Sequence, residues 1–258
     1  MKRRLPWNSK PLRGGFLDVQ LSHWRHFHDY LNESVPNAET YVWRGQRDAA
    51  WSLQSSLDRL LTSATDTAGT AIGGIQESQH LARFQLASRG RRGASPRHDI
   101  SEEEWWALGQ HHGLATPLLD WTGSPYVALY FAFEESDAPD SGTRAVWAIA
   151  ELELRVNADL ARSPMLQFVR PHQDENPRLV SQAGLFTRTP SGLSVDKWVR
   201  DNYGREKSVP ILMRITIPDD EQPRCLDSLN LMNVNRLSLF PDLSGASHHC
   251  NWQIANLP

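Results

Sequence analysis

The sequence predicts a single α+β domain, because its strand and helix patterns do not follow the regular rhythm of a parallel α/β fold. Residues 118–121 form a short apolar run, residues 144–154 are rich in strand-forming side chains, and residues 209–217 alternate in hydrophobicity. The 258 residues are enough to bury a substantial core, and 40% of them are hydrophobic. No internal repeat and no convincing domain break divide the chain.

We expect residues 1–15 to form a basic, flexible tail and residues 16–258 to form the domain, with a loop-rich insertion at 62–100. The remaining elements follow from hydrophobic periodicity and from the positions of glycine and proline. Helices are expected at 21–31, 51–61, 76–87, 227–240 and the C-terminal end, a strand at 41–44, a loop at 163–177 and an extended element around a turn at 178–187.

Two helix starts are marked by their capping residues. Ser101 and Glu104 form a capping box for a helix that should end at Gly113. Ser124 can cap a second helix, and Pro125 suits its first position. This second helix is apolar on nearly every side, so we expect it to lie buried between layers.

The charge balance argues against a general electrostatic binder of nucleic acid. Lysine and arginine number 27 and the acidic residues 30, which gives a net charge of −3. The arginines at 89, 91, 92 and 97 are either part of a solvated loop or a local patch for a polyanion.

The composition points to a cytoplasmic protein that does not enter membranes. No apolar run is long enough to span a bilayer, and the basic N-terminal stretch lacks the apolar segment of a secretory signal. The two cysteines, Cys225 and Cys250, form neither a disulfide framework nor a metal-binding spacing, so a reducing compartment is expected.

Tryptophan is unusually frequent, with ten in the chain. So many aromatic side chains indicate either a heavily packed core or surfaces on which a flat ligand stacks, and core packing is the commoner case. Trp121 is the residue for which both readings stay open, since it lies inside a polar motif.

The first candidate motif is Arg44-Gly45-Gln46 at the end of a strand. An arginine there can present its forked cation to a phosphate or carboxylate, while a glycine lets a ligand approach the backbone. The alternative is an ordinary surface arginine at a turn.

The second motif is Gln110-His111-His112-Gly113 at the end of a helix. Adjacent helical residues point about 100° apart, so the two histidines are poorly placed to share a metal ion. Contact with a ligand, or an interaction with the helix dipole, is the better reading.

The third motif runs from Asp120 to Pro125, where a buried strand meets a buried helix. Free backbone amides at the helix start can bind an anion, and Thr122 and Ser124 add hydroxyl donors. Asp120 would be costly in an apolar stretch unless it is hydrogen-bonded. The alternative is that Asp120 and Ser124 only brace the turn.

A fourth motif contains Gln182 and Phe186, and its glutamine either contacts a ligand or satisfies a turn. The common catalytic and nucleotide-binding signatures are missing, since the chain has no Walker loop, GxGxxG, GxSxG or HExxH.

Together these motifs resemble the FRG-domain family. The Phe-Arg-Gly element that names the family occurs here as WRGQ at 43–46, with Trp43 in place of phenylalanine. The blocks 109–133, 178–187 and 239–245 resemble the family's other motif blocks, so that the resemblance covers most of the chain.

A second resemblance is to ADP-ribosyltransferases of the arginine–serine–glutamate type, which implies a split β-sheet with helical additions. In this comparison Arg44 would hold a phosphate of NAD, Thr122 and Ser124 would border the nicotinamide, and Trp121 or Phe186 would stack on its ring. Gln46, Gln110, His111 and His112 are further expected contacts. Gln182 stands where the glutamate is expected, and an amide cannot supply negative charge beside an oxocarbenium ion. Either the activity is then low, or another group such as Asp120 or Glu206 supplies this charge, or the site only binds.

These resemblances imply a cytoplasmic effector that binds NAD or a related nucleotide. It would transfer ADP-ribose to a nucleic acid or protein, or cleave the nicotinamide bond, in a toxin–antitoxin or phage-defence setting with a matching partner. The alternatives are a non-catalytic module that binds a nucleotide or nucleic acid, and a hydrolase that uses Asp120 and His112 as acid and base.

Overall fold

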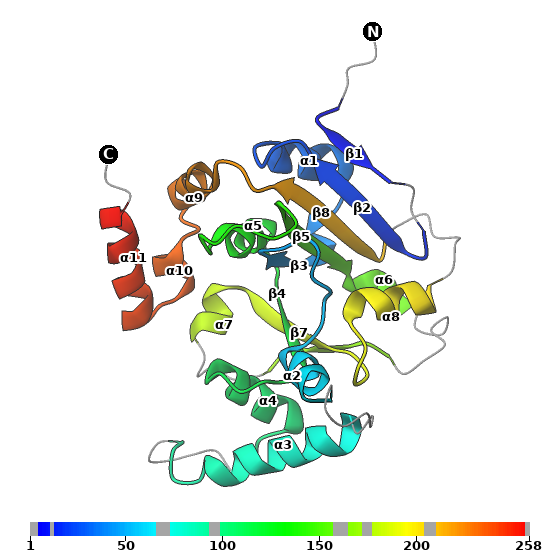
Figure 1. Cartoon of the computed structure of the whole chain (residues 1–258), viewed down its shortest axis with the longest axis vertical. Helices are drawn as coiled ribbons and strands as arrows, with labels where there is room; N and C mark the ends of the chain where they lie inside the picture. Colours follow the sequence, from blue (N-terminus) through cyan, green and yellow to red (C-terminus); the bar gives the residue numbers. More distant parts are fainter. Residues whose placement is uncertain are drawn as a thin grey trace.

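A computed structural model describes residues 5–10, 13–65, 73–92, 99–156, 165–171, 177–203 and 210–255. These residues form one α+β fold on a mixed, eight-stranded sheet, which confirms the predicted class (Figure 1). The strand order is β1-β2-β8-β5-β3-β4-β7-β6, in which β2 and β8 are parallel and the other neighbours antiparallel. The strands are β1 (Trp7–Ser9), β2 (Phe16–Leu21), β3 (Tyr41–Gln46), β4 (Leu118–Thr122), β5 (Thr143–Ala150), β6 (Gln167–Val169), β7 (Gly184–Arg188) and β8 (Leu212–Pro218).

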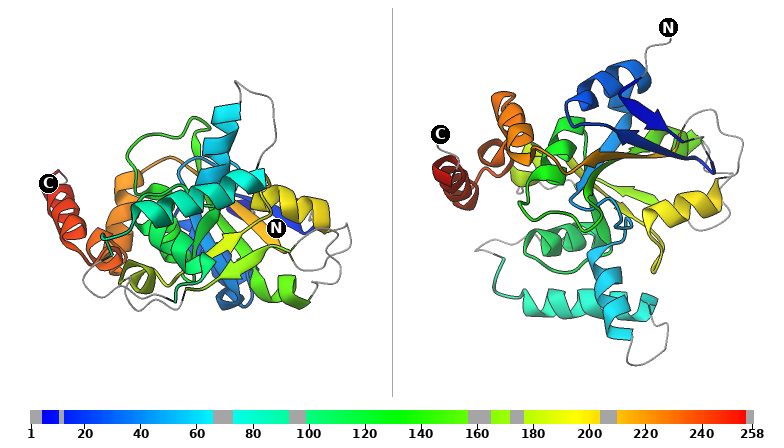
Figure 2. Two further views of the ribbon diagram at one scale, coloured as in Figure 1. Left: turned by 90° about the horizontal axis from the view of Figure 1, so that it is seen from below. Right: turned by 45° about the horizontal axis from the view of Figure 1, so that its top comes forward.

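Helices pack on both faces of the sheet and at one end of it. The helices are α1 (His26–Ser34), α2 (Ser56–Thr65), α3 (Gly73–Ala87), α4 (Glu102–His111), α5 (Pro125–Phe133), α6 (Glu151–Val156), α7 (Pro177–Ser181), α8 (Val195–Asn202), α9 (Gln222–Leu231), α10 (Arg236–Leu239) and α11 (Leu243–Ala255), with a 3-10 turn at Ala38–Thr40. One core joins α1, α5 and α9 to the sheet, and a second joins α8 to its other face. A third core lies between α2, α3 and α4 and the β4, β6 and β7 end (Figure 2).

Helix α5 is buried on nearly every side, as its composition predicts. Ser124 caps it by accepting a hydrogen bond from the Val127 amide at 3.4 Å, and Pro125 occupies its first turn. The capping box of α4 is also confirmed, since Ser101 and Glu104 exchange backbone-to-side-chain hydrogen bonds.

Strand β3 lies directly against α5, and Gly45 makes this approach possible. A Cβ atom at Gly45 would lie 2.0 Å from the Ala128 carbonyl oxygen and 2.4 Å from the Ala132 amide nitrogen. The small side chains of Ala128 and Ala132, four residues apart on one helix face, therefore meet a strand residue that has none. The helix fills the space where a side chain would lie, while Gly45 itself also lines the cavity described below.

The sheet separates between β3 and β4. Each other antiparallel pair is in register over at least three residues, whereas the described residues join β3 to β4 at Trp43 and Thr122 alone. Beyond this point the strands diverge, and their side chains, rather than backbone hydrogen bonds, occupy the space between them. The consequence is an opening within the sheet, beside Arg44.

Three expected elements differ from the structure in where they begin or end, or in their type. The helix expected at 21–31 begins only at His26, because Leu21 ends β2. The expected tail at 1–15 contains β1, which pairs with β2. The expected strand at 144–154 ends at Ala150 and continues as α6.

Three further differences concern loops. The expected loop at 163–177 contains β6, and the expected helix at 227–240 is two helices, separated where Asn233 takes a left-handed φ of 59°. Within the expected insertion at 62–100, α3 begins at Gly73, three residues earlier than expected. Arg97 and Glu206 lie outside the described residues.

None of the helices that the structure describes is both long enough and apolar enough to span a lipid bilayer. Those same residues bring no three potential metal ligands of the histidine, cysteine or carboxylate type together.

Candidate functional site

The opening between β3 and β4 leads into a cavity of about 650 Å³. This volume lies within the range of small-molecule sites. Seven residues expected from the sequence line it: Arg44, Gly45, Gln46, Asp120, Trp121, Thr122 and Gln182. Residues far apart in the chain are thus brought to one place by the neighbouring strands β3 and β4 and by the turn before β7.

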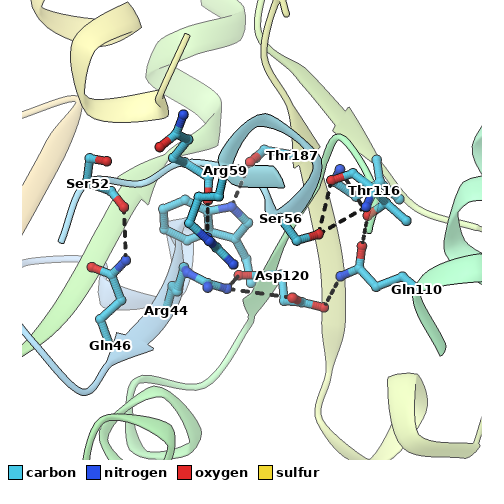
Figure 3. A network of polar contacts seen from close by, with 12 residues as sticks. Arg44, Gln46, Ser52, Ser56, Arg59, Gln110, Thr116, Asp120 and Thr187 are labelled. Carbon is cyan, nitrogen blue, oxygen red and sulfur yellow. Dashed lines mark hydrogen bonds and ion pairs between the residues drawn. The ribbon is translucent and has the colours of Figure 1, made fainter. Parts of the chain in front are cut away.

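Arg44 bridges the diverging strands. Its Nη1 donates to the backbone oxygen of Asp120 at 2.8 Å and lies 3.7 Å from the carboxylate of the same residue (Figure 3). The Nε atom is buried and has no hydrogen-bond partner among the described residues. An unpaired buried donor is costly, so this guanidinium has bonding capacity that the protein itself leaves unused.

A second arginine lies beside Arg44. Arg59 of α2 donates to the backbone oxygen of Gln54 at 2.7 Å, and among the described residues it makes no ion pair with a carboxylate (Figure 3). Burial lowers the pKa of Arg44, the Asp120 carboxylate opposes that shift, and the positive charge of Arg59 adds to it. Two neighbouring guanidiniums, of which only Arg44 pairs with a carboxylate among the described residues, form an anion-binding environment.

Asp120 is held by hydrogen bonds rather than by apolar packing. Its carboxylate accepts a hydrogen bond from Gln110 Nε2 at 2.7 Å, and 63% of its side chain is exposed. Gln110 in turn accepts from the Thr116 hydroxyl, and the Thr116 amide donates to the Ser56 hydroxyl at 3.0 Å (Figure 3). Asp120 thus has the hydrogen bond that the sequence analysis required of it, but its side chain is exposed whereas the other four residues of β4 are buried.

Thr122 and Gln182 meet at the end where β3 and β4 are joined. The Thr122 hydroxyl donates to the Gln182 backbone oxygen at 2.6 Å and accepts from the Ser124 amide at 3.1 Å. The Gln182 side chain donates to the Leu239 backbone oxygen at 3.1 Å, which fixes α10 against this turn. Gln182 precedes β7 and does not lie on it.

Gln46 and Trp121 are both tied to buried polar partners. Gln46 accepts from the indole of Trp147 at 2.7 Å and donates to the Ser52 backbone oxygen at 3.2 Å. The Trp121 indole donates to the Thr187 hydroxyl at 2.8 Å, and its side chain is buried. Trp121 therefore packs in the core along one edge and borders the cavity along another.

The remaining expected residues lie outside the cavity wall. Phe186 is buried in the core beneath α4, because its position on β7 turns it to that side. Ser124 is used as a helix cap, and Gln110 acts through Asp120. His111 and His112 are exposed at the end of α4, where burial and the neighbouring positive charges of His112 and Arg178 lower the pKa of His111. The structure does not pair His112 with Asp120.

Sequence reasoning missed several residues of the wall. They come from the loop after β3, from α2, from the end of α5 and from the segment after α10, which are separated in sequence and meet only in the fold. These residues are Arg47, Trp51, Ser52, Arg59, Phe131, Glu134, Glu135 and Phe240. The run FAFEE after the buried helix was the one signal that polar groups return at the end of α5.

Residues 39–141 match the family model described as the FRG domain. This match includes Arg44, Asp120 and Thr122, and it confirms the resemblance seen in the sequence. No curated protein and no solved structure matches the chain.

Proposed function

The chain contains an FRG domain, and we propose that the cavity beside Arg44 binds NAD or a related nucleotide. In this proposal the protein transfers ADP-ribose to a macromolecular target or cleaves the nicotinamide bond. The observation that supports it is the pair of guanidiniums at the cavity: Arg44 has a buried Nε without a partner, and Arg59 has no carboxylate among the described residues. A pyrophosphate can supply an acceptor oxygen for the Arg44 Nε and negative charge for Arg59.

We also propose that the sheet is a split sheet of the ADP-ribosyltransferase kind. The divergence of β3 from β4 after a single residue pair is what a split sheet requires. Arg44, Thr122 and Gln182 line one cavity in the order that the motif comparison expects.

We assign to Asp120 the negative charge that the Gln182 amide cannot provide. Its carboxylate is accessible, and Gln110 and Arg44 hold it in place. In the reaction the bond between the ribose C1′ and the nicotinamide nitrogen breaks, and nicotinamide leaves as a neutral molecule. The acceptor oxygen or nitrogen, or water, then bonds to C1′ and gives its proton to Asp120. The negative charge of Asp120 stabilises the oxocarbenium-like transition state.

The cellular setting is also part of the proposal. We place the protein in the cytoplasm as an effector of a toxin–antitoxin or phage-defence system, with a nucleic acid or protein as acceptor and a partner that restrains it.

The test is turnover of labelled NAD with DNA, RNA and cell lysate as acceptors, together with calorimetric measurement of NAD binding. Asp120→Asn should lower turnover by about 10²–10⁴-fold and leave NAD binding intact. Asp201→Asn is the matched control, because Asp201 lies on α8 in a surface pair with Lys197. No turnover with any acceptor and no NAD binding would refute the proposal, whereas salt-dependent binding of DNA or RNA without turnover would favour the binding module.

A further inference from the structure

The cavity has an exposed aromatic wall at the end away from Thr122. Trp51 lines the cavity, and 46% of this residue's surface is exposed. The nine other tryptophans are all less exposed than Trp51, so an indole left open at a cavity mouth is unusual in this chain. Exposed indole faces next to cations are the surfaces on which flat heteroaromatic rings stack.

The loop that carries Trp51 is rigidly attached to the sheet. The Trp51 amide donates to the Asp48 backbone oxygen at 3.2 Å, and the buried Asp48 carboxylate accepts from the amides of Ala50 and Ser141. The next residue, Ser52, is fixed to β3 through Gln46. The indole is therefore presented by an ordered loop, so that stacking on it costs little conformational entropy.

Arg47 already occupies the stacking position over Trp51. Its guanidinium carbon lies 5.0 Å from the centre of the indole ring, and its Nη1 pairs with Glu135 at 2.9 Å and Asp137 at 3.3 Å. Both carboxylates are largely exposed, so these pairs hold the arginine weakly. The buried Nε of Arg47 has no partner among the described residues. A ring that stacks on Trp51 can displace the Arg47 guanidinium, and the displaced guanidinium can then bind a phosphate.

The order of residues along β3 gives the cavity two ends. Trp43 pairs with Thr122 at the joined end, Arg44 follows, and Gln46 leads to Trp51 at the open end. A strand advances about 3.3 Å for each residue, so Arg44 lies between the two ends. With a pyrophosphate at Arg44 and the nicotinamide near Thr122, the second base of a dinucleotide falls at Trp51.

We infer that Trp51 is the stacking platform for a purine base and that Arg47 is its cationic partner. The site then selects purine nucleotides that carry a pyrophosphate, and Trp51 determines this specificity. The inference rests on the proposed function for the position of the pyrophosphate, but it concerns binding and needs no turnover.

The experiment measures the dissociation constants of ADP-ribose and of ribose 5-phosphate for the full chain and its variants. Trp51→Ala should weaken ADP-ribose binding by roughly 5- to 150-fold, the range expected for the loss of one stacked base. Trp51→Phe should keep most of the affinity, and ribose 5-phosphate should bind weakly and equally to all variants. Trp105→Ala is the matched control, because Arg92 lies 4.7 Å over Trp105 in a similar pair outside the cavity.

The outcomes separate this inference from the proposed reaction. ADP-ribose binding that depends on Trp51, without turnover of NAD, supports the inference and refutes the reaction. Turnover of NAD that is unchanged in Trp51→Ala overturns the inference and leaves the reaction standing. Failure of the wild-type chain to bind ADP-ribose, or equal losses in Trp51→Ala and Trp105→Ala, also overturns the inference.

Discussion

Two strand-borne arginines, Arg44 on β3 and Arg144 on β5, have very different surroundings. The Arg144 side chain is 1% exposed, pairs with Asp219 at 2.6 Å and donates to the backbone oxygens of Ala132 and Glu135 at the end of α5. The Arg44 side chain is 20% exposed, bonds to Asp120 and leaves Nε without a partner among the described residues. The strand register turns the two side chains to opposite faces of the sheet.

The difference shows what distinguishes a structural arginine from a candidate ligand-binding one. Arg144 terminates a buried helix and satisfies carbonyl groups that would otherwise lack donors. Arg44 bridges two strands that have already separated, and the cavity lies beside it. Burial is common to both residues, so the informative property is the set of donors that the protein leaves unpaired.

The largest effect that this comparison predicts is on stability. Arg144→Met removes the donors for Asp219 and for three carbonyl groups, and it should lower the free energy of unfolding by about 3–5 kcal/mol. Denaturant unfolding measures it, with Lys197→Met at an exposed surface pair as the control. A loss as small as that of the control would remove the contrast between the two arginines.

Arg44→Gln should act mainly on binding. Loss of the charge-assisted contacts should weaken NAD binding by about 1.5–3 kcal/mol, because the cavity keeps its shape but loses a cation. Unfolding of the same variant should show a smaller change than that of Arg144→Met. If Arg44→Gln unfolds the protein as severely, then Arg44 is also a structural arginine.

Gly45→Ala tests the contact between β3 and α5, on the face of the sheet opposite to the Arg44 side chain. The added Cβ would meet α5 backbone atoms at 2.0 and 2.4 Å, so unfolding should become easier by about 1–3 kcal/mol. Gly123→Ala is the control, since the nearest atom to its added Cβ would be 3.7 Å away. Equal stability of the two variants would show that the helix does not need this glycine.

The smallest effect is expected for Arg59→Gln. Arg59 is exposed, so the free energy of unfolding should stay within about 0.5 kcal/mol of the wild type. Affinity for NAD should fall by about 0.2–1 kcal/mol, measured by calorimetry beside Arg89→Gln, a change outside the cavity. Unaltered affinity would assign the anion site to Arg44 alone.

Local signals in the sequence predicted the two capped helix starts and the central strands well, whereas the helices expected from residues 21, 51 and 227 begin at His26, Ser56 and Gln222. Ser101 with Glu104, and Ser124 with Pro125, are short-range capping patterns that do not depend on the rest of the fold. Short strands such as β1 and β6 were missed because a three-residue strand exists only through its partner. The break at Asn233 was missed because a left-handed asparagine gives little warning inside an apolar periodic segment.

The candidate site was predictable only where its residues lie on motifs. Arg44 and Asp120 stood out because charged residues interrupt apolar strands. Arg59 and Trp51 follow no local pattern, and only the packing of α2 and of the loop after β3 brings them to the cavity. Phe186 was misplaced because the facing of a short strand depends on its register, which the sequence did not determine.

The single residue pair between β3 and β4 divides the sheet into a five-strand part and a three-strand part among the described residues. Backbone hydrogen bonds connect the strands within each part. Across this seam the Arg44 side chain bonds to the Asp120 backbone oxygen, and the second core packs side chains of both parts together. The seam is therefore the line along which the described sheet has the shortest strand pairing. Amide hydrogen exchange should be faster for the β3 and β4 residues that face the seam than for residues inside either part. A ligand that bridges Arg44 and Asp120 should slow the exchange of these amides.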